Sequence, residues 1–404
     1  MISLTRQYQV PLAVPYWSAA TYRAILRSVF SGRIVDGPDL SDLRSLLIQE
    51  LGVPNALLCN SGSMALEIAL RACDLRPGDE VVIPTFCCTS VVAPILAVGA
   101  HPVLADVGEE LNITSETLQA ALTKKSRAII VPHLFGNPAD IESIIDLARA
   151  RNIRVIDDAA QALGATIAGR PAGTFGDAGI LSFGSDKVCF GLGGGAVVSR
   201  HGFVERSSEV EMAAPQLVPL LRNLSSTLLW RRWRRWSLPL HEALYRGRAT
   251  DPERPQEPYR KQSMSNLNAA VASSLMRTLR DNLLERRARV RVYQTLLGEE
   301  KRLVLVPHQA GSACLTQVVR VLPKVDGGDG ASDLVAALRS AGYEVQGSYI
   351  PIHLLAPYRQ LATTSLPRAE AIWADLIELP CEPDASVEHV ERIASIVKQT
   401  IRSS

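Results

Sequence analysis

Short runs of aliphatic and β-branched residues alternate with longer helical patterns through the first half of this chain. Helical patterns span residues 40–52, 89–98 and 140–151. The short runs occupy residues 81–83, 101–105, 127–132, 154–158, 179–183 and 196–199. This order predicts βαβ units, in which a mostly parallel sheet is buried between layers of helices. We therefore expect an α/β fold.

The chain has 404 residues, too many for one compact core, which predicts two domains. We expect a large domain over residues 1–202 and a smaller α+β domain over residues 261–404, with the N-terminal segment as a candidate for packing on the small domain. Residues 203–260 carry a Trp/Arg cluster and a Pro-rich stretch, and we interpret them as a connector or insertion. The C-terminal part shows helical patterns and one extended run, at residues 266–297, 332–341, 387–401 and 343–345.

Composition excludes several classes of protein. Hydrophobic residues make up 47% and charged residues 21% of the chain, as in soluble globular enzymes. A net charge of +2 does not favour nucleic-acid binding, no apolar run reaches the roughly 18–20 residues of a spanning helix, and the N-terminus lacks the apolar core of a signal peptide. The seven scattered cysteines form no C-x-x-C pair, which indicates free thiols in the cytoplasm rather than disulfides or a metal site.

Lys187 stands out among only seven lysines. It follows the predicted strand at 179–183 and precedes a glycine-rich run at 191–195. The carboxyl end of a strand is where open α/β sheets bind ligands, and partial desolvation there lowers the pKa of an ammonium, as a Schiff-base lysine requires. The alternative is an exposed turn lysine.

Two further elements are predicted at the same edge of the sheet. Asp158 ends a strand, and because side chains alternate, Asp157 points to the opposite face. A carboxylate at this edge can hold the pyridine nitrogen of pyridoxal phosphate (PLP) in its protonated form. The alternative is a helix cap, a role that we assign to Asp157.

The segment Ser61-Gly62-Ser63-Met64 opens a predicted helix, and the free amides at a helix N-terminus suit a phosphate. Such a turn is also an ordinary N-cap. Ser182 would add a hydroxyl to this site.

Five long segments carry a family resemblance. They are CNSGSMALEIAL at 59–70, GDEVVIPTF…GAHPVLADV at 78–107, HLFGNPAD…VIDDAAQALGA at 133–165, GRPAGTFGDAGILSFGSDKVCFGLGGGAVVS at 169–199, and PIHLLAPYRQL…ELPCEPDASVEHVERI from residue 351. In these segments the chain resembles the DegT/DnrJ/StrS family of PLP-dependent sugar aminotransferases. The resemblance implies the fold-type-I architecture, with a mostly parallel seven-stranded sheet between helices and a smaller α+β C-terminal domain.

The resemblance also implies roles for individual residues. Lys187 would form the Schiff base with PLP and later carry the proton, Asp158 would pair with the pyridine nitrogen, and Gln161 would lie near the ring's phenolic oxygen. The residues implied at the phosphate are Gly62, Ser63, Met64 and Ser182. The family works as homodimers whose active sites include residues of the partner chain, so we expect a homodimer.

The chain departs from the family pattern in four places. Cys88 stands where an aromatic residue usually stacks on the PLP ring, and Val188 replaces the asparagine that commonly follows the lysine. Lys261 replaces the first residue of the partner chain's N-Y-R-M segment, and we hypothesise that its charge at the phosphate offsets the weaker stack. Residues 203–260 do not align with the family.

Three features are candidates for substrate or surface contacts. His133 and His353 lie in segments that would reach the active edge, although a lone histidine is more often structural. The cluster at 228–240, with Trp230, Trp233 and Trp236 among arginines, has three interpretations. It is a packing helix with solvated arginines, a site for an anionic substrate group such as a nucleotide-sugar diphosphate, or a surface that attaches to an anionic membrane.

From these features we predict an aminotransferase that moves an amino group from an amino acid such as glutamate to a nucleotide-linked keto-sugar in amino-sugar or natural-product biosynthesis. Lys187 argues against the family's dehydratase branch, in which that lysine is replaced. One alternative keeps PLP for a different reaction: elimination, replacement or carbon–carbon bond formation. Another is a non-catalytic PLP-binding regulator, which would need a DNA-binding module that the sequence does not indicate.

Overall fold

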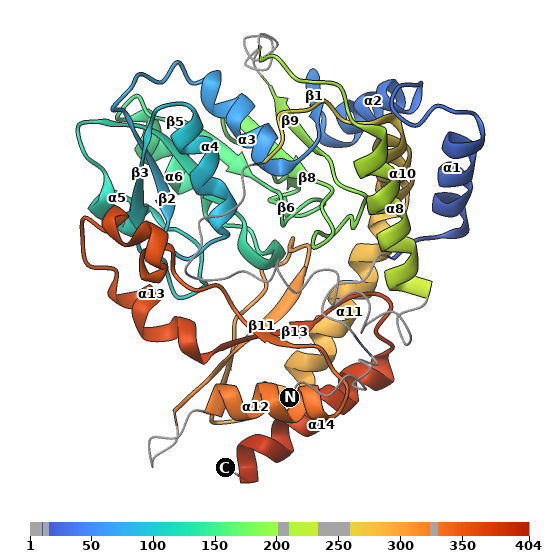
Figure 1. Ribbon diagram of the computed structural model, residues 1–404. Helices are drawn as coiled ribbons and strands as arrows, with labels where there is room; N and C mark the ends of the chain where they lie inside the picture. The colour runs from blue at the N-terminus through green and yellow to red at the C-terminus, as the bar shows by residue number, and fades with distance from the viewer. Residues whose placement is uncertain (1–9, 11–15, 201–209, 233–258, 324–329, 404) are drawn as a thin grey trace.

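A seven-stranded sheet forms the centre of the larger part of the molecule (Figure 1). The computed structural model describes residues 10, 16–200, 210–232, 259–323 and 330–403. The strands follow the order β1-β9-β8-β5-β4-β2-β3, and the predicted α/β fold with a mostly parallel sheet is confirmed. Their bounds are β1 (Asn55–Cys59), β2 (Glu80–Pro84), β3 (His101–Ala105), β4 (Ser126–Pro132), β5 (Arg154–Asp158), β8 (Ala178–Ser182) and β9 (Gly195–Ser199).

The direction of the strands brings distant segments to one edge. Strands β3, β2, β4, β5 and β8 are parallel, while β9 runs antiparallel to both of its neighbours, β8 and β1. All strands except β9 therefore end at the same edge, and β9 begins there. The segments that follow β1, β2, β4, β5 and β8 meet at this edge, where such sheets bind their ligands.

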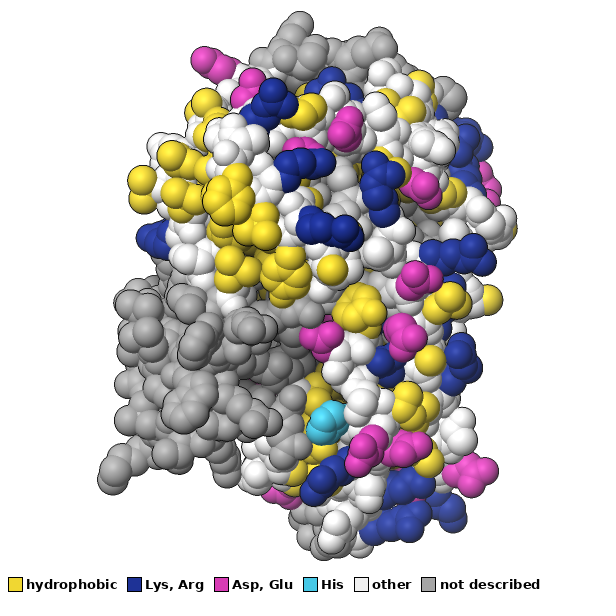
Figure 2. All heavy atoms as spheres, turned by 90° about the vertical axis from the view of Figure 1, so that its right-hand side faces the viewer, with side chains coloured by type: hydrophobic (Ala, Val, Ile, Leu, Met, Phe, Trp, Pro, Cys, Tyr) yellow, Lys and Arg dark blue, Asp and Glu magenta, His cyan; other side chains and the backbone are white. Residues whose placement is uncertain are grey.

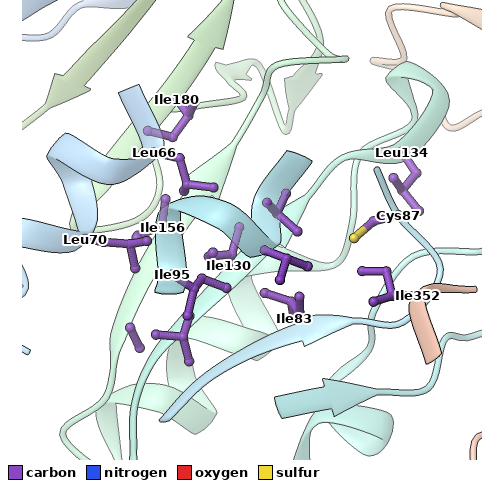
Figure 3. Packing of buried hydrophobic residues seen from close by; sticks show 14 of the residues in the cluster. Leu66, Leu70, Ile83, Cys87, Ile95, Ile130, Leu134, Ile156, Ile180 and Ile352 are labelled. Atoms are coloured by element: carbon purple, nitrogen blue, oxygen red, sulfur yellow. The ribbon is translucent and has the colours of Figure 1, made fainter. Parts of the chain in front are cut away.

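Helices cover both faces of this sheet. On one face, Leu66 and Leu70 point from α3 toward Ile156 and Ile180 of the strands (Figure 3). On the other face, Val155 packs with residues of α5 and α6. Because strand side chains alternate, Asp158 shares the α3 face with Ile156. The helices and short helical turns from the N-terminus to the end of α6 are α1 (Ala19–Phe30), α2 (Asp39–Leu51), α3 (Gly62–Arg71), η1 (Thr89–Val91), α4 (Val92–Ala97), α5 (Ser115–Ala121), η2 (Leu134–Gly136) and α6 (Ile141–Arg149). A two-stranded ribbon joins β6 (Thr166–Ile167) to β7 (Arg170–Pro171).

The C-terminal part is built on a four-stranded antiparallel sheet in the order β10-β11-β13-β12. Ile377 and Leu379 of β13 share a core with α14, whereas Leu376 belongs to the core of the large sheet. One face of the small sheet therefore looks toward the large sheet. The elements are β10 (Leu303–Leu305), β11 (Thr316–Val321), α12 (Gly330–Ser340), β12 (Gln346–Gly347), η4 (Ile352–Leu354), η5 (Ala356–Leu361), α13 (Pro367–Ile372), η6 (Trp373–Asp375), β13 (Leu376–Pro380) and α14 (Val387–Ser403).

The single helix expected over residues 266–297 is two helices, α10 (Asn266–Arg277) and α11 (Leu279–Leu297). The break falls at Thr278, whose φ of −107° and ψ of 7° are not helical. Helix α10 packs against α1 and α2 beside the large sheet, while α11 reaches α14. We therefore propose a domain boundary at this break rather than at residue 261.

Two other segments connect to this framework. The backbone of Val10 pairs with Tyr343, and its side chain lies in the small-sheet core, so this N-terminal residue does pack there. Helix α8 (Leu217–Arg232) touches the large domain through Asn223, whose amide donates to the Leu192 carbonyl at 2.6 Å. Most of the Trp/Arg cluster, from residue 233 onward, lies outside the described residues. None of the helices in the described ranges is both long and apolar enough to cross a membrane.

Candidate active site

Lys187 lies in the loop that joins β8 to β9 at the carboxyl edge of the sheet. Its side chain is only 13% exposed, and Nζ donates to the Asp186 carboxylate at 3.1 Å. The expectation that burial lowers the pKa of this ammonium is wrong for the single chain. Burial does lower the pKa, but the charge and hydrogen bond of Asp186, together with the charge of Asp158, help to raise it above its ordinary value. In the absence of a cofactor, Lys187 therefore holds its proton at neutral pH.

Asp158 is buried beside Lys187, at the end of β5. Its Oδ1 accepts a hydrogen bond from the Ala160 amide at 2.9 Å. Burial raises the pKa of Asp158, while the Ala160 amide and the charge of Lys187 oppose the rise. A buried carboxylate with a cationic neighbour is the environment in which a protonated ring nitrogen would be held.

Asp157 does not take the helix-cap role predicted for it. It is fully buried on the opposite face, where Oδ1 lies 2.7 Å from His133 Nε2 and Oδ2 accepts from the Phe175 amide at 2.8 Å. The other ring nitrogen of His133 accepts from the Ala139 amide at 2.9 Å. Both nitrogens of His133 are therefore used inside the fold, which corrects its assignment as a possible substrate contact.

The N-terminus of α3 and Ser182 converge from two strands. Ser61 caps the helix, and its Oγ accepts from the Met64 amide at 3.2 Å. A Cβ placed on Gly62 would lie 3.2 Å from Ser182 Cβ, a tight contact that would push the Ser182 side chain, so glycine favours this close approach. A Cβ on Gly195 would meet the Ser61 carbonyl oxygen at 2.3 Å, so one of the glycines after Lys187 serves backbone packing.

The Met64 amide is engaged by Ser61 in this structure, which leaves the amides of Gly62 and Ser63 at the open end of the helix. Ala65 makes the first helical hydrogen bond, to the Ser61 carbonyl at 3.0 Å. The Ser182 hydroxyl accepts from the Gly184 amide at 3.4 Å and keeps its own proton for another acceptor. Two amides and a hydroxyl around a glycine fit a phosphate.

Both polar atoms of the Gln161 side-chain amide form hydrogen bonds. Oε1 accepts from the Phe135 amide at 2.9 Å, and Nε2 donates to the hydroxyl of Tyr349 at 3.0 Å. Tyr349 comes from the small domain, and no local sequence signal marks it as a site residue. Its ring lies 5.9 Å from that of Phe135 and 6.0 Å from that of Phe86. These aromatic rings line the same edge as Cys88, which is partly exposed and receives a contact from Ser90 Oγ at 3.0 Å.

His353 lies where the small domain meets the end of β2. Its Nδ1 is 2.7 Å from Thr85 Oγ1, and Nε2 is 3.2 Å from Glu370 Oε1. The neighbouring Ile352 lies close to Cys87 and Leu134 (Figure 3). His353 therefore holds the small domain against the active edge, and its two nitrogens are engaged there.

The side chain of Lys261 contacts helix α3 of its own chain, at Glu67, rather than the phosphate turn. Its Nζ is 2.6 Å from Oε1 of Glu67, a fully buried carboxylate that also binds Tyr259 and Arg71. Burial raises the pKa of Glu67, but the hydrogen bonds from Lys261, Tyr259 and Arg71 lower it below its ordinary value. The hypothesis that Lys261 reaches a partner's phosphate stays a prediction.

The described residues contain no group of three or more His, Cys, Asp or Glu side chains that could hold a metal ion. They do bring together a lysine, a buried carboxylate and an open helix N-terminus at one edge of a mostly parallel sheet. This constellation fits PLP, because it offers a partner for each of its aldehyde, ring nitrogen and phosphate. The fold and site thus define a class, the PLP-dependent enzymes of fold type I.

The chain belongs to the DegT/DnrJ/EryC1/StrS aminotransferase family, whose model matches residues 18–398. It is 31% identical over 359 residues to the UDP-N-acetyl-3-dehydro-alpha-D-glucosamine 3-aminotransferase of Acidithiobacillus ferrooxidans, covering 87% of this chain and 85% of that protein. It is 28% identical over 355 residues to the GDP-perosamine synthase of Caulobacter vibrioides, covering 87% and 86%. The recognised family and the PLP-dependent aminotransferase class are confirmed.

Solved structures show the same fold over almost the whole chain. PseC of Helicobacter pylori, an aminotransferase involved in the biosynthesis of pseudoaminic acid, superimposes with a TM-score of 0.80 at 19% identity, covering 99% of this chain and 100% of that one. The aminotransferase TlmJ of Streptoalloteichus hindustanus gives a TM-score of 0.77 at 24% identity, covering 98% and 99%. PLP supplies an electron sink for bonds at the substrate's amino-bearing carbon.

Proposed function

We propose that this enzyme transfers an amino group from an amino acid, with glutamate as the first donor to test, to a keto-sugar carried on a nucleotide. The observation that carries the proposal is the placement of Lys187 beside Asp158, at the same sheet edge as the N-terminus of α3. Relatives named for a GDP-linked and a UDP-linked sugar support the nucleotide. Amino-sugar or natural-product biosynthesis is the expected setting.

Each residue of the site has a proposed task. Lys187 would bind the cofactor covalently and, once released from it, would move a proton at the substrate carbon. For this second role the amine must first lose its own proton, which is stabilised in this structure by the hydrogen bond to Asp186. Asp158 keeps the ring nitrogen protonated. Gly62, Ser63 and Ser182 bind the phosphate, and Gln161 orients the ring from its fixed position between Phe135 and Tyr349.

A half-reaction assay tests this function. The purified enzyme, loaded with PLP, is mixed with L-glutamate without any sugar, and the visible absorption of the bound cofactor is followed. We expect the absorption to fall as 2-oxoglutarate appears in equal amount. If no amino acid produces a keto acid, while products of elimination or replacement appear, the enzyme catalyses a different PLP reaction. Binding of PLP without any turnover would instead support a regulator.

We also propose that the enzyme is a homodimer. Leu26 and Phe30 of α1 and Val218 of α8 are 52%, 85% and 76% exposed in the single chain. Apolar side chains gather on the side of the molecule that carries these helices (Figure 2). Exposed apolar patches of this kind mark protein interfaces. Light scattering should give twice the mass of the chain, and Phe30→Glu should weaken the dimer.

A cytoplasmic location completes the proposal, because all seven cysteines are free thiols, as is usual in a reducing compartment. Cell fractionation with an antibody to the enzyme checks it.

A further inference from the structure

A third carboxylate, Glu378, reaches the active edge from the small domain. It lies in the middle of β13 and is 8% exposed. Its neighbours Ile377 and Leu379 are fully buried in the small-sheet core, so by the alternation of strand side chains Glu378 points to the other face, which looks toward the large sheet. Val318 stands opposite Glu378 on β11 and belongs to the core of the large sheet, which agrees with this direction.

One short segment fixes Glu378 and a second active-site residue together. The hydroxyl of Ser348 donates to Glu378 Oε1 at 3.0 Å. The next residue, Tyr349, receives the hydrogen bond from Gln161 at 3.0 Å. The dipeptide Ser348-Tyr349 therefore holds the small sheet against the loop after β5, with Glu378 on the side that faces the site.

The charged and titratable groups that act on Glu378 are those of the site itself. Asp186 and Lys187, from the loop after β8, are close enough for their charges to act on Glu378, and Glu378 acts in turn on the hydroxyl of Tyr349. Among the described residues, Ser348 is the hydrogen-bond donor to this carboxylate. Within the described ranges, no cationic side chain forms a hydrogen bond with this buried carboxylate, although it lies near two charged active-site residues, so the arrangement does not favour stability.

We propose that Glu378 faces the bound substrate and that its charge state discriminates between the amino-acid donor and the sugar acceptor. The proposal rests on the transamination proposed above, in which two substrates use the site in turn. An amino-acid donor brings carboxylates to the reacting centre, which an ionised Glu378 repels. The acceptor brings a sugar ring there, whose hydroxyls donate hydrogen bonds to an ionised Glu378, while its charged diphosphate lies outside the ring. The neutral form of Glu378 therefore admits the donor, and the ionised form favours the sugar.

The protonation of Glu378 makes the proposal measurable near neutral pH. Burial raises the pKa of Glu378 to about 7, with Asp186 adding to the rise and the hydrogen bond from Ser348 and the charge of Lys187 opposing it. If only the neutral form admits the donor, the apparent dissociation constant of glutamate rises about tenfold between pH 6 and pH 8, in proportion to the loss of that form.

The experiment titrates L-glutamate against the PLP-loaded enzyme between pH 6 and pH 8.5, without sugar, for the natural enzyme and Glu378→Gln. We expect the rise in the natural enzyme to be absent from Glu378→Gln, because glutamine carries no charge at any of these pH values. In full turnover, Glu378→Gln should raise the KM of the sugar while leaving the KM of glutamate low at pH 8. Equal pH dependence in the two proteins overturns the proposal.

Ser348→Ala should shift the pKa of Glu378 without removing its carboxyl group. Loss of the Ser348 hydroxyl removes a donor that favours the ionised carboxylate, so the inflection in glutamate affinity should move to higher pH. An inflection that stays in place overturns the proposal even if Glu378→Gln does not fold. Glu382→Gln is the matched control, because Glu382 also has a pKa raised to about 7 by burial, although it pairs with Arg286 at 2.5 Å inside the small domain. Its glutamate profile should match the natural one.

A measurement on the cofactor-free protein does not depend on catalysis. A carboxyl group whose folded pKa is raised contributes stability that is lost as pH rises through that pKa. The unfolding midpoint of the natural protein should therefore fall more between pH 5 and pH 8 than that of Glu378→Gln. If the two fall equally, the proposal fails. If instead no amino acid alters the cofactor's absorption at any pH, the proposed function fails, which is a separate result.

Discussion

Gln161 donates a hydrogen bond to the hydroxyl of Tyr349 at 3.0 Å, across 188 residues of chain. This bond joins the loop after β5, next to Asp158, to the segment that follows β12. The small domain is therefore held directly against the residues proposed to bind the cofactor ring.

Replacing Tyr349 by Phe should weaken PLP binding. The change leaves the Gln161 amide without its acceptor, at a cost of about 1–3 kcal/mol for a buried group, and frees the side chain to turn away from the ring. Fluorescence titration with PLP should show an affinity lower by about tenfold. Tyr293→Phe is the control, since it also loses a buried hydroxyl contact, to the Pro380 carbonyl at 3.1 Å, but in the small-domain core. Equal PLP affinity in both variants would contradict the assignment.

Lys187→Arg should abolish the covalent attachment of PLP and the half-reaction. Arginine keeps the positive charge beside Asp186 but does not form the bond. After borohydride reduction of the natural enzyme, mass spectrometry should find the cofactor on the peptide that contains Lys187 and find none in the variant. A labelled peptide from elsewhere in the chain would refute the role of Lys187.

Asp158→Asn and Asp157→Asn form a matched pair on adjacent residues. Asp158→Asn should slow the glutamate half-reaction by about 10²–10⁴-fold, the range for a positioned group that controls a proton, with little loss of stability. Asp157→Asn should instead destabilise the protein by about 1–3 kcal/mol, because asparagine offers one oxygen where His133 and the Phe175 amide use two, so one of them loses its acceptor, while the half-reaction continues. Stopped-flow absorbance and urea unfolding measure the two effects. The opposite pattern would exchange the two roles.

Lys261→Ala distinguishes the role in the described chain from the role at a partner's phosphate. In this chain Lys261 lowers the pKa of Glu67, and a carboxylate with a lowered pKa contributes stability that is lost as pH falls through that pKa. In the variant the pKa of Glu67 should be higher, so urea unfolding should show the acid loss of stability beginning at higher pH. A fall in PLP affinity as well would support the contact with the partner's phosphate, and unchanged affinity would exclude it.

Much of the large domain could be predicted because its signals are local. The helix at 40–52 and the strands at 101–105 and 154–158 match α2, β3 and β5 closely, and Gly52 ends α2 with the left-handed φ of 61° that favours glycine. Helix α1 and strand β1 were not predicted. Helix α1 packs against α10, where the Thr21 hydroxyl bonds that of Ser274 at 2.9 Å. A contact between residues so far apart in the chain cannot be predicted from the local periodicity of the sequence.

The sequence by itself determined which residues lie at the carboxyl ends of the predicted strands. These residues include the candidates Lys187, Asp158 and Ser182. Parallel strands place their ends at one edge whatever their pairing order, so this inference needed no tertiary detail. Only the tertiary structure decided how side chains pair across that edge. Asp157 pairs with His133 and Lys261 with Glu67, while the small domain places Tyr349 against Gln161 and Glu378 close enough to Lys187 for their charges to interact. Such pairings depend on distances between residues far apart in the chain, which composition, periodicity and motif spacing do not encode.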